Sequence, residues 1–189
     1  MNTVVHLTLG TLFAAAVSAA LAAPLPPPPT GSKVINTALP QMKAQGIADG
    51  IEVEKENDNF PHECSSVSTL RLGYGWQVLP GGDKVVDMMA QTPEEPASDH
   101  MGVRDEPAGK KRYLDGVLTW RKSTMTVIGT SESGCKLKEI VTYDGTWAAY
   151  IAGKIVGVHA FRVYGSKDAG QALIDDYAAR MKTAVAAGN

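Results

Sequence analysis

Hydrophobic and polar residues alternate most clearly between residues 70 and 78. Five apolar residues occupy every second position of this segment: Leu70, Leu72, Tyr74, Trp76 and Val78. This period of two predicts a strand with one face in a core, and Gly73 and Gly75 leave its other face thin. A turn is predicted at 80–83, and residues 84–91 are interpreted as the returning strand of a hairpin.

Further alternating segments follow residue 111, and the residues between them predict an antiparallel meander. The predicted strands cover residues 113–121, 124–130, 135–143, 147–152 and 155–164. Turns are predicted at Lys122–Ser123, 131–134 and Asp144–Gly145, and Gly153–Lys154 joins the last two strands. Because residues 155–164 are apolar at both alternating sets of positions, this strand is expected in the centre of the sheet.

A helical period begins near the C-terminus, with Ser166 as the expected N-cap and Asp168 in the first turn. Apolar residues recur there at spacings of three and four: Leu173, Ile174, Tyr177, Ala178, Met181, Ala184 and Val185. About 20 helical residues span about 30 Å, enough to cross a sheet. The predicted fold class is therefore α+β: an antiparallel, meander-like sheet of six or seven strands with a long C-terminal helix packed on one face.

Three segments lack a clear strand pattern. Residues 34–48 predict a short helix that Pro40 either begins or kinks. The polar residues 49–63 predict a loop. Residues 92–109 contain three prolines and five acidic residues, which predicts a long mobile loop that is either functional or a disordered surface excursion.

The N-terminal pattern points to export. The first 23 residues contain no Lys, Arg, Asp or Glu, and an apolar run from 7 to 21 ends in the small-x-small pattern of 20–22. We therefore predict a signal peptide over residues 1–22, a stiff Pro-rich leader over 23–32, and a single α+β domain over 33–189. A membrane-spanning helix is the weaker interpretation, because a span needs about 18 uninterrupted apolar residues.

The chain has two cysteines, Cys64 and Cys135. An exported protein meets an oxidising environment, so these residues are predicted to form a disulfide. A reactive thiol is the alternative, but neither cysteine lies in a C-x-x-C motif.

Composition and motifs exclude several functions. The 18 basic and 20 acidic residues nearly balance, and the basic residues are scattered, so no nucleic-acid partner is expected. His62 and Cys64 lack a second ligand pair for zinc, and no cofactor or metal is expected. The S-x-x-K match at Ser133–Lys136 lies in a predicted turn, so no catalytic residue is assigned.

Four residues are candidates for contact with a ligand or partner. His159 is either a core histidine satisfied by a backbone carbonyl or, less favoured, a catalytic base. Arg162 is a charge inside an apolar strand, so it needs a partner or an anionic ligand. The simplest interpretation of Trp120 and Trp147 is that they are aromatic residues of the core, although an exposed tryptophan could serve as a binding anchor.

These observations favour an exported, periplasmic or secreted, non-enzymatic binding protein that recognises another envelope protein in an inhibitor or immunity-type role. One alternative is a carrier of a small apolar ligand held between sheet and helix. A less favoured alternative is a hydrolase-type enzyme that uses His159, with Arg162 binding an anion. No transmembrane segment is expected in the mature chain.

Overall fold

The computed structural model describes residues 24–58, 60, 61, 63, 64, 68–127 and 134–187. The elements in this part of the chain are, in order, β1 (Lys33–Thr37), α1 (Pro40–Ala44), β2 (Ala48–Glu56), β3 (Thr69–Val78), α2 (Gly82–Gln91), β4 (Ser98–His100), β5 (Val103–Tyr113), β6 (Gly116–Thr126), β7 (Glu139–Ile151), β8 (Lys154–Tyr164) and α3 (Lys167–Ala187).

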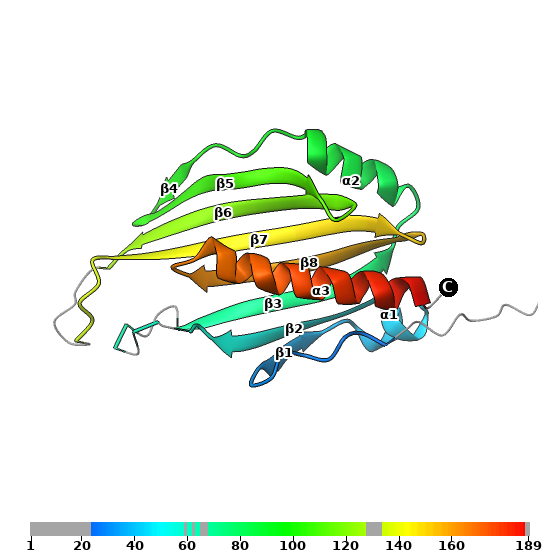
Figure 1. Cartoon of the computed structure of the whole chain (residues 1–189), viewed down its shortest axis with the longest axis horizontal. Coiled ribbons are helices and arrows are strands. Elements are labelled where there is room, and N and C mark those ends of the chain that lie inside the picture. The colour runs from blue at the N-terminus through cyan, green and yellow to red at the C-terminus, as the bar shows by residue number, and fades with distance from the viewer. Residues whose placement is uncertain (1–23, 59, 62, 65–67, 128–133, 188–189) are drawn as a thin grey trace, which may run out of the picture.

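The strands form one antiparallel sheet in the order β1-β2-β3-β8-β7-β6-β5-β4 (Figure 1). The predicted α+β fold is confirmed, with eight described strands instead of six or seven. Strand β8 lies in the interior of the sheet between β3 and β7, as its apolar sequence predicts. In β3 the period of two holds, because the side chains at 70, 72, 74 and 76 are buried and those between them are not.

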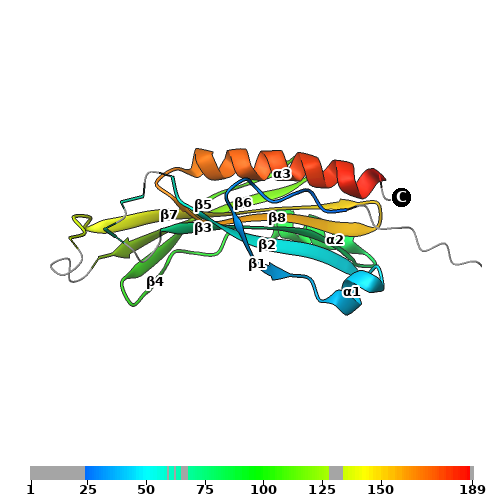
Figure 2. The ribbon, with the colours of Figure 1, turned by 90° about the horizontal axis from the view of Figure 1, so that it is seen from below.

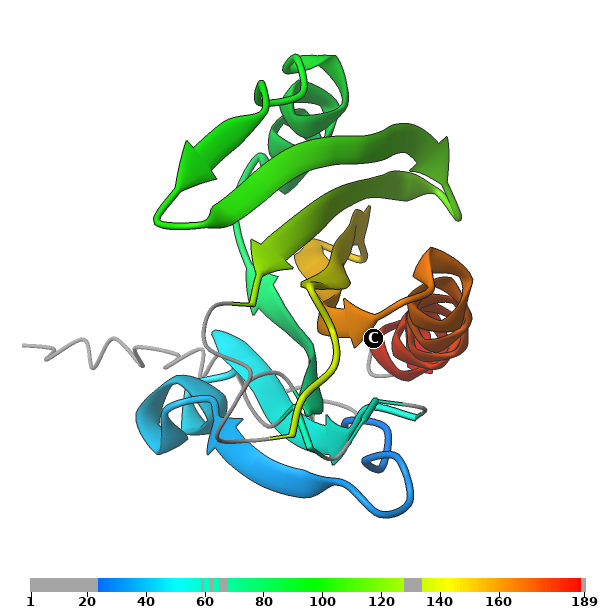
Figure 3. The same cartoon turned by 90° about the vertical axis from the view of Figure 1, so that its left-hand side faces the viewer.

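Helix α3 packs on one face of the sheet, which curves around it (Figures 2 and 3). Five residues of the predicted stripe are buried: Ile174, Tyr177, Ala178, Met181 and Val185. Leu173 and Ala184 are only partly buried, and Gly170, which was not predicted, is buried as well. The buried residues meet the largest core side chains, among them the fully buried Trp147 and Leu118. We call this covered side the α3 face and the opposite side the open face.

Shorter elements border the open face. Helix α2 packs against Tyr150 and Ile155 at one end of the sheet, and so closely that a Cβ on Gly82 would lie 2.7 Å from the Tyr150 ring. Helix α1 lies on the side of the sheet opposite α3 (Figure 2). An ion pair of 3.1 Å between Lys43 and the buried Asp49 ties α1 to β2.

The strand predicted at residues 84–91 is wrong, because this segment belongs to helix α2. Its apolar residues also recur at helical spacing, and Val86 is buried while Met88 is exposed. The turn before it ends at Gly81, whose φ of 72° starts the helix rather than a hairpin. A short apolar run cannot by itself distinguish the two structures.

The predictions for residues 34–63 are also largely wrong. Only Pro40–Ala44 is helical, and Pro40 begins this helix as one of the two alternatives proposed. Most of the predicted polar loop is strand β2. Ile51 and Val53 pack on the α3 face, whereas Glu52 and Glu54, which alternate with them, lie on the other face.

The long loop predicted at 92–109 is shorter than expected, because β4 and most of β5 lie within it. These strands lie at one edge of the sheet and have polar residues on both faces. Because neither face is buried, apolar and polar residues do not alternate in their sequence. The turns predicted at Lys122–Ser123 and Asp144–Gly145 are wrong as well, because β6 and β7 run through them. The β5–β6 turn instead uses Leu114 and Asp115, both with positive φ.

The predicted signal peptide, residues 1–22, lies outside the described residues, but most of the Pro-rich leader is described. We call residues 24–29 the strap. Tyr74 and Tyr177 donate hydroxyl hydrogen bonds to the carbonyls of Pro26 and Pro27, at 3.0 and 2.9 Å. Leu25 packs against the core, so the strap is docked on the seam between β3 and α3.

Candidate functional site

A groove crosses the open face of the sheet. Its largest part has a volume of about 470 Å³, and a neighbouring hollow of about 330 Å³ extends it to residues 93–95. Further hollows adjoin these two, and neighbouring hollows share a lining residue at four central positions: Asp144, Thr146, His159 and Phe161. The floor of the largest part includes the glycines of β2, β3 and β8: Gly50, Gly73, Gly75 and Gly157. We call this surface the open-face groove.

A β-bulge lies where β7 and β8 pass the middle of the groove. The pairing of the two strands shifts register between Tyr143 and Gly145, and Arg162 on β8 has a φ of 58°. Positive φ is uncommon for a residue with a side chain and costs of order 1 kcal/mol or more. A bulge changes the direction in which a strand presents its side chains, here at the wall of the groove.

Three hydrogen bonds hold this strained backbone in place. Asp144 Oδ1 accepts the backbone N–H of Arg162 at 2.7 Å. Asn57 brackets the same residue from the end of β2, because its Nδ2 donates to the Arg162 carbonyl at 3.0 Å and its Oδ1 accepts the N–H of Tyr164 at 3.1 Å. Asn57 is itself only 8% exposed. The backbone of Arg162 is therefore held by Asp144 on β7 and by Asn57, which directly follows β2.

The guanidinium of Arg162 lies beside the Phe161 ring. Its Cζ lies 5.3 Å from the centroid of the Phe161 ring, and Arg162 takes part in none of the ion pairs between described residues. By contrast, Arg121 at the far end of the groove pairs with Glu95 at 2.9 Å. Phe161 thus presents an apolar ring beside a cation that no described carboxylate occupies.

His159 lies beside the same ring, with its own centroid 5.7 Å from that of Phe161. Although the imidazole reaches solvent, nearby protein atoms remove part of its hydration and lower the pKa of His159, against the opposing effect of Asp144 and Glu52. Burial likewise raises the pKa of Asp144, against the effects of the Arg162 N–H and the His159 charge. The site therefore combines, at neutral pH, a neutral imidazole, a shielded carboxyl and a guanidinium that has no ion pair with a described carboxylate.

The four residues singled out from the sequence fall into two groups. His159 and Arg162 come together at the groove. The two tryptophans lie in the core on the α3 face, 5% exposed for Trp120 and 0% for Trp147. Trp147 Nε1 donates to the carbonyl of Tyr113, and Trp120 Nε1 donates to Gln171 on α3.

Sequence reasoning missed Asp144 and Asn57. For Asp144, the sequence feature that could have indicated the bulge is the Asp144–Gly145 pair. A short side chain that accepts hydrogen bonds, followed by glycine, is suited to a β-bulge as well as to a hairpin turn. Gly145 fits only without a side chain, since a Cβ would lie 2.5 Å from the Trp120 ring. Asn57 had no distinguishing pattern within its polar segment.

The space between the sheet and α3 is filled by side chains. The largest fully buried residues there come from both layers: Trp147, Leu72, Leu118, Ile174, Met181 and Val158. A small apolar ligand held between sheet and helix would have to displace some of them.

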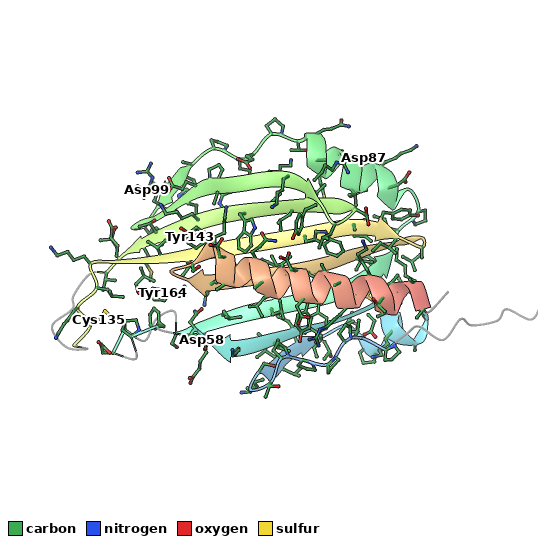
Figure 4. All side chains as sticks on the ribbon, in the orientation of Figure 1. Asp58, Asp87, Asp99, Cys135, Tyr143 and Tyr164 are labelled. Atoms are coloured by element: carbon green, nitrogen blue, oxygen red, sulfur yellow. A yellow bond between two sulfur atoms is a disulfide. The ribbon has the colours of Figure 1, made fainter. Side chains whose placement is uncertain are left out.

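The predicted disulfide is present and supports the bulge. Cys64 and Cys135 are bonded, with their Cα atoms 4.8 Å apart. They form a small buried cluster with Phe60 and Ile140, against which Tyr164 packs at the same end of the molecule (Figure 4). Since Asn57 precedes this cluster by only a few residues, the disulfide anchors the segment that brackets Arg162.

No group of three or more His, Cys, Asp or Glu residues converges as a metal site within the described part of the chain. Comparison with protein families, with curated proteins and with solved structures finds no significant match. Among the described helices, none is both long enough and apolar enough to cross a membrane.

Proposed function

We propose that this protein is exported and works as a non-enzymatic binding protein, which recognises another protein of the cell envelope through the open-face groove in an inhibitor or immunity-type role. The observation that carries the proposal is Arg162. Its backbone is held in a strained conformation by Asp144 and Asn57, and its guanidinium has no ion pair with a described carboxylate. Backbone strain of this kind is typically maintained at functional sites.

Export is supported by two features. The uncharged, apolar N-terminus has the pattern of a signal peptide, and the Cys64–Cys135 disulfide is of a kind that persists outside reducing compartments. Fractionation of the producing cells, with separate recovery of periplasm and medium, tests this export.

The groove favours an extended protein segment with one acidic group. Gly73 has open space where a Cβ would be, so a partner backbone can approach the floor closely. Phe161 offers an apolar contact, and Arg162 offers the planar donor fork that matches a carboxylate. A binding anchor of this kind, an aromatic ring beside an arginine, is common at protein interfaces.

The proposal is tested by site-specific photocrosslinking in the cell. A photoreactive amino acid at Thr146, in the groove, should yield one discrete protein adduct, and Arg162→Ala should abolish it. The same amino acid at Ala172, exposed on the outer side of α3, should yield none. An adduct from Ala172 but not from Thr146 would place the binding surface elsewhere.

The variant His159→Ala distinguishes a binding protein from an enzyme that uses the His159 imidazole. A binding protein should keep its biological phenotype with this substitution as long as the adduct persists. Loss of the phenotype with an unchanged adduct would instead indicate a catalytic role for the imidazole.

A further inference from the structure

The strap, residues 24–29, lies on the other side of the sheet from the open-face groove. Beneath it Tyr74 and Tyr177 stand side by side, with ring centroids 4.7 Å apart and only 3% and 2% of their surfaces exposed. Their hydroxyls donate to two consecutive strap carbonyls, at 3.0 and 2.9 Å. Two tyrosines from different elements thus hold one short proline-rich segment.

This is the chemistry by which proteins recognise polyproline. A proline has no backbone N–H, so its carbonyl is the polar group that a binding site has to contact. Aromatic grooves bind such segments because the chain is already extended and loses little entropy on docking. The Tyr74–Tyr177 pair therefore has the features of a polyproline-binding site, which the chain fills with its own strap.

The strap is joined to the sheet by a local turn. Ser32 donates its N–H and its hydroxyl to the Pro29 carbonyl, at 3.1 and 2.6 Å, and Gly31 has a φ of 78°, which glycine adopts without strain. Since β1 begins at Lys33, opening this turn frees the strap without breaking a strand pair. All the strap contacts can then re-form on another copy, which makes exchange of a terminal segment a low-cost route to a dimer.

We propose that Tyr74 and Tyr177 form a polyproline-binding site that accepts the strap of a second copy of this chain, so that two copies exchange straps. The second copy is the occupant because its residues 24–29 are identical to the segment that already satisfies both hydroxyls. The proposal is independent of the open-face groove.

The first experiment tests the site. A variant lacking residues 23–32 should bind a fluorescent peptide of sequence PLPPPPTGS, residues 24–32, in an anisotropy titration. Combining Tyr74→Phe with Tyr177→Phe in that variant should weaken binding by about tenfold or more, because two hydrogen bonds are lost. Tyr150→Phe, outside the site, is the matched control. Absence of saturable peptide binding would overturn the site itself.

The second experiment tests the exchange by complementation. The strapless variant has an empty site, and the Tyr74→Phe, Tyr177→Phe protein with its strap intact has a weakened site and a free donor segment. Mixed, the two should sediment as a heterodimer in analytical ultracentrifugation, whereas each alone should stay monomeric. A mixture that stays monomeric although the peptide binds would overturn strap exchange.

If the strapless variant does not fold, the intact exported protein serves instead. Two pools labelled at the N-terminus with a donor or an acceptor fluorophore should develop energy transfer after mixing, and the double Phe variant should develop little, because its weakened sites hold an exchanged strap poorly. No energy transfer at any protein concentration would overturn the proposal.

Discussion

Asp144 and Arg162 are joined across β7 and β8 by a hydrogen bond of 2.7 Å from the Arg162 N–H to Asp144 Oδ1. Each residue lies where its strand leaves regular pairing, so a carboxylate takes the place of the missing ladder acceptor. The bond therefore serves two purposes, because it satisfies a backbone donor and fixes the direction of the Arg162 side chain at the groove.

Removing the Asp144 carboxylate should destabilise the bulge. Asp144→Ala leaves the Arg162 N–H without its acceptor, which costs about 1–3 kcal/mol. Asp144→Asn keeps an oxygen at Oδ1 and should lose less than half as much. The free energy of unfolding, measured by urea denaturation, checks both values, with the exposed Asp99→Ala as control. Equal losses for the Ala and Asn variants would contradict this role.

The difference in stability between the natural protein and Asp144→Asn should depend on pH. Burial raises the pKa of Asp144 in the folded protein above its ordinary value of 3.8, so folding favours the protonated carboxyl. Its contribution to stability is fully present below about pH 3.8 and is lost as pH rises through the folded-state pKa. The stability of the natural protein relative to Asp144→Asn should therefore fall between pH 3 and 7. Urea denaturation at stepped pH measures this difference, and a flat or rising difference contradicts it.

His159 should show the opposite behaviour. Loss of hydration lowers its pKa below 6.5 in the folded protein, so folding favours the neutral imidazole. That contribution is present above about pH 6.5 and is lost as pH falls through the folded-state pKa. We expect the stability advantage of the natural protein over His159→Asn to shrink between pH 7.5 and 5, measured by thermal unfolding. His100→Asn, an exposed histidine on β4, is the control; an unchanged advantage would show that His159 is not desolvated.

The sequence predicted the elements that are buried in a regular way. Strand β3, the interior strand β8 and helix α3 each bury one periodic set of side chains, and that burial is visible as a period in the sequence. Strands β4 and β5, at one edge of the sheet, were missed because they have polar residues on both faces. Strand β1, at the other edge, was taken for part of a helix because Val34 and Ile35 lie at helical spacing with later apolar residues, although both are exposed. Helix α2 was taken for a strand because its apolar run is too short to decide between the two periods.

The candidate site was predictable only in part. His159 and Arg162 attract notice because a charge is unusual in an apolar strand. Asp144 and Asn57 are distant from them in sequence and act through backbone hydrogen bonds, which leave no pattern of residue types. Only the three-dimensional pairing of β7 with β8, and the approach of the segment after β2, brings these residues to the bulge.

The disulfide should contribute strongly to stability and to the order of the bulge. It closes a loop of 71 residues, which is worth about 4 kcal/mol through the entropy of the unfolded chain. The double variant Cys64→Ser, Cys135→Ser should lose about 2–5 kcal/mol in urea denaturation. Amide hydrogen exchange should also rise at Tyr164, whose N–H depends on Asn57. Retention of the full melting temperature, with or without a reducing agent, would contradict this prediction.

Substitutions at two glycines near the groove should affect different properties, stability at Gly145 and partner binding at Gly73. Gly145 lies on the α3 face, where a Cβ would lie 2.5 Å from the Trp120 ring and 2.7 Å from Ile174. Gly145→Ala should therefore cost about 1–3 kcal/mol through overpacking. Gly73 lies on the groove floor, where a Cβ would meet no atom within 4 Å, so a side chain there points into open space.

Gly73→Leu should consequently block the groove while leaving the fold intact. We expect its free energy of unfolding to stay within about 1 kcal/mol of that of the natural protein, as for most surface substitutions. The photocrosslinked adduct formed from Thr146 should disappear, because the leucine occupies the floor on which the partner segment lies. Gly145→Ala, still folded but less stable, should keep the adduct and so serves as the control. A Gly73→Leu protein that forms the adduct in undiminished yield would show that the partner does not lie in the groove.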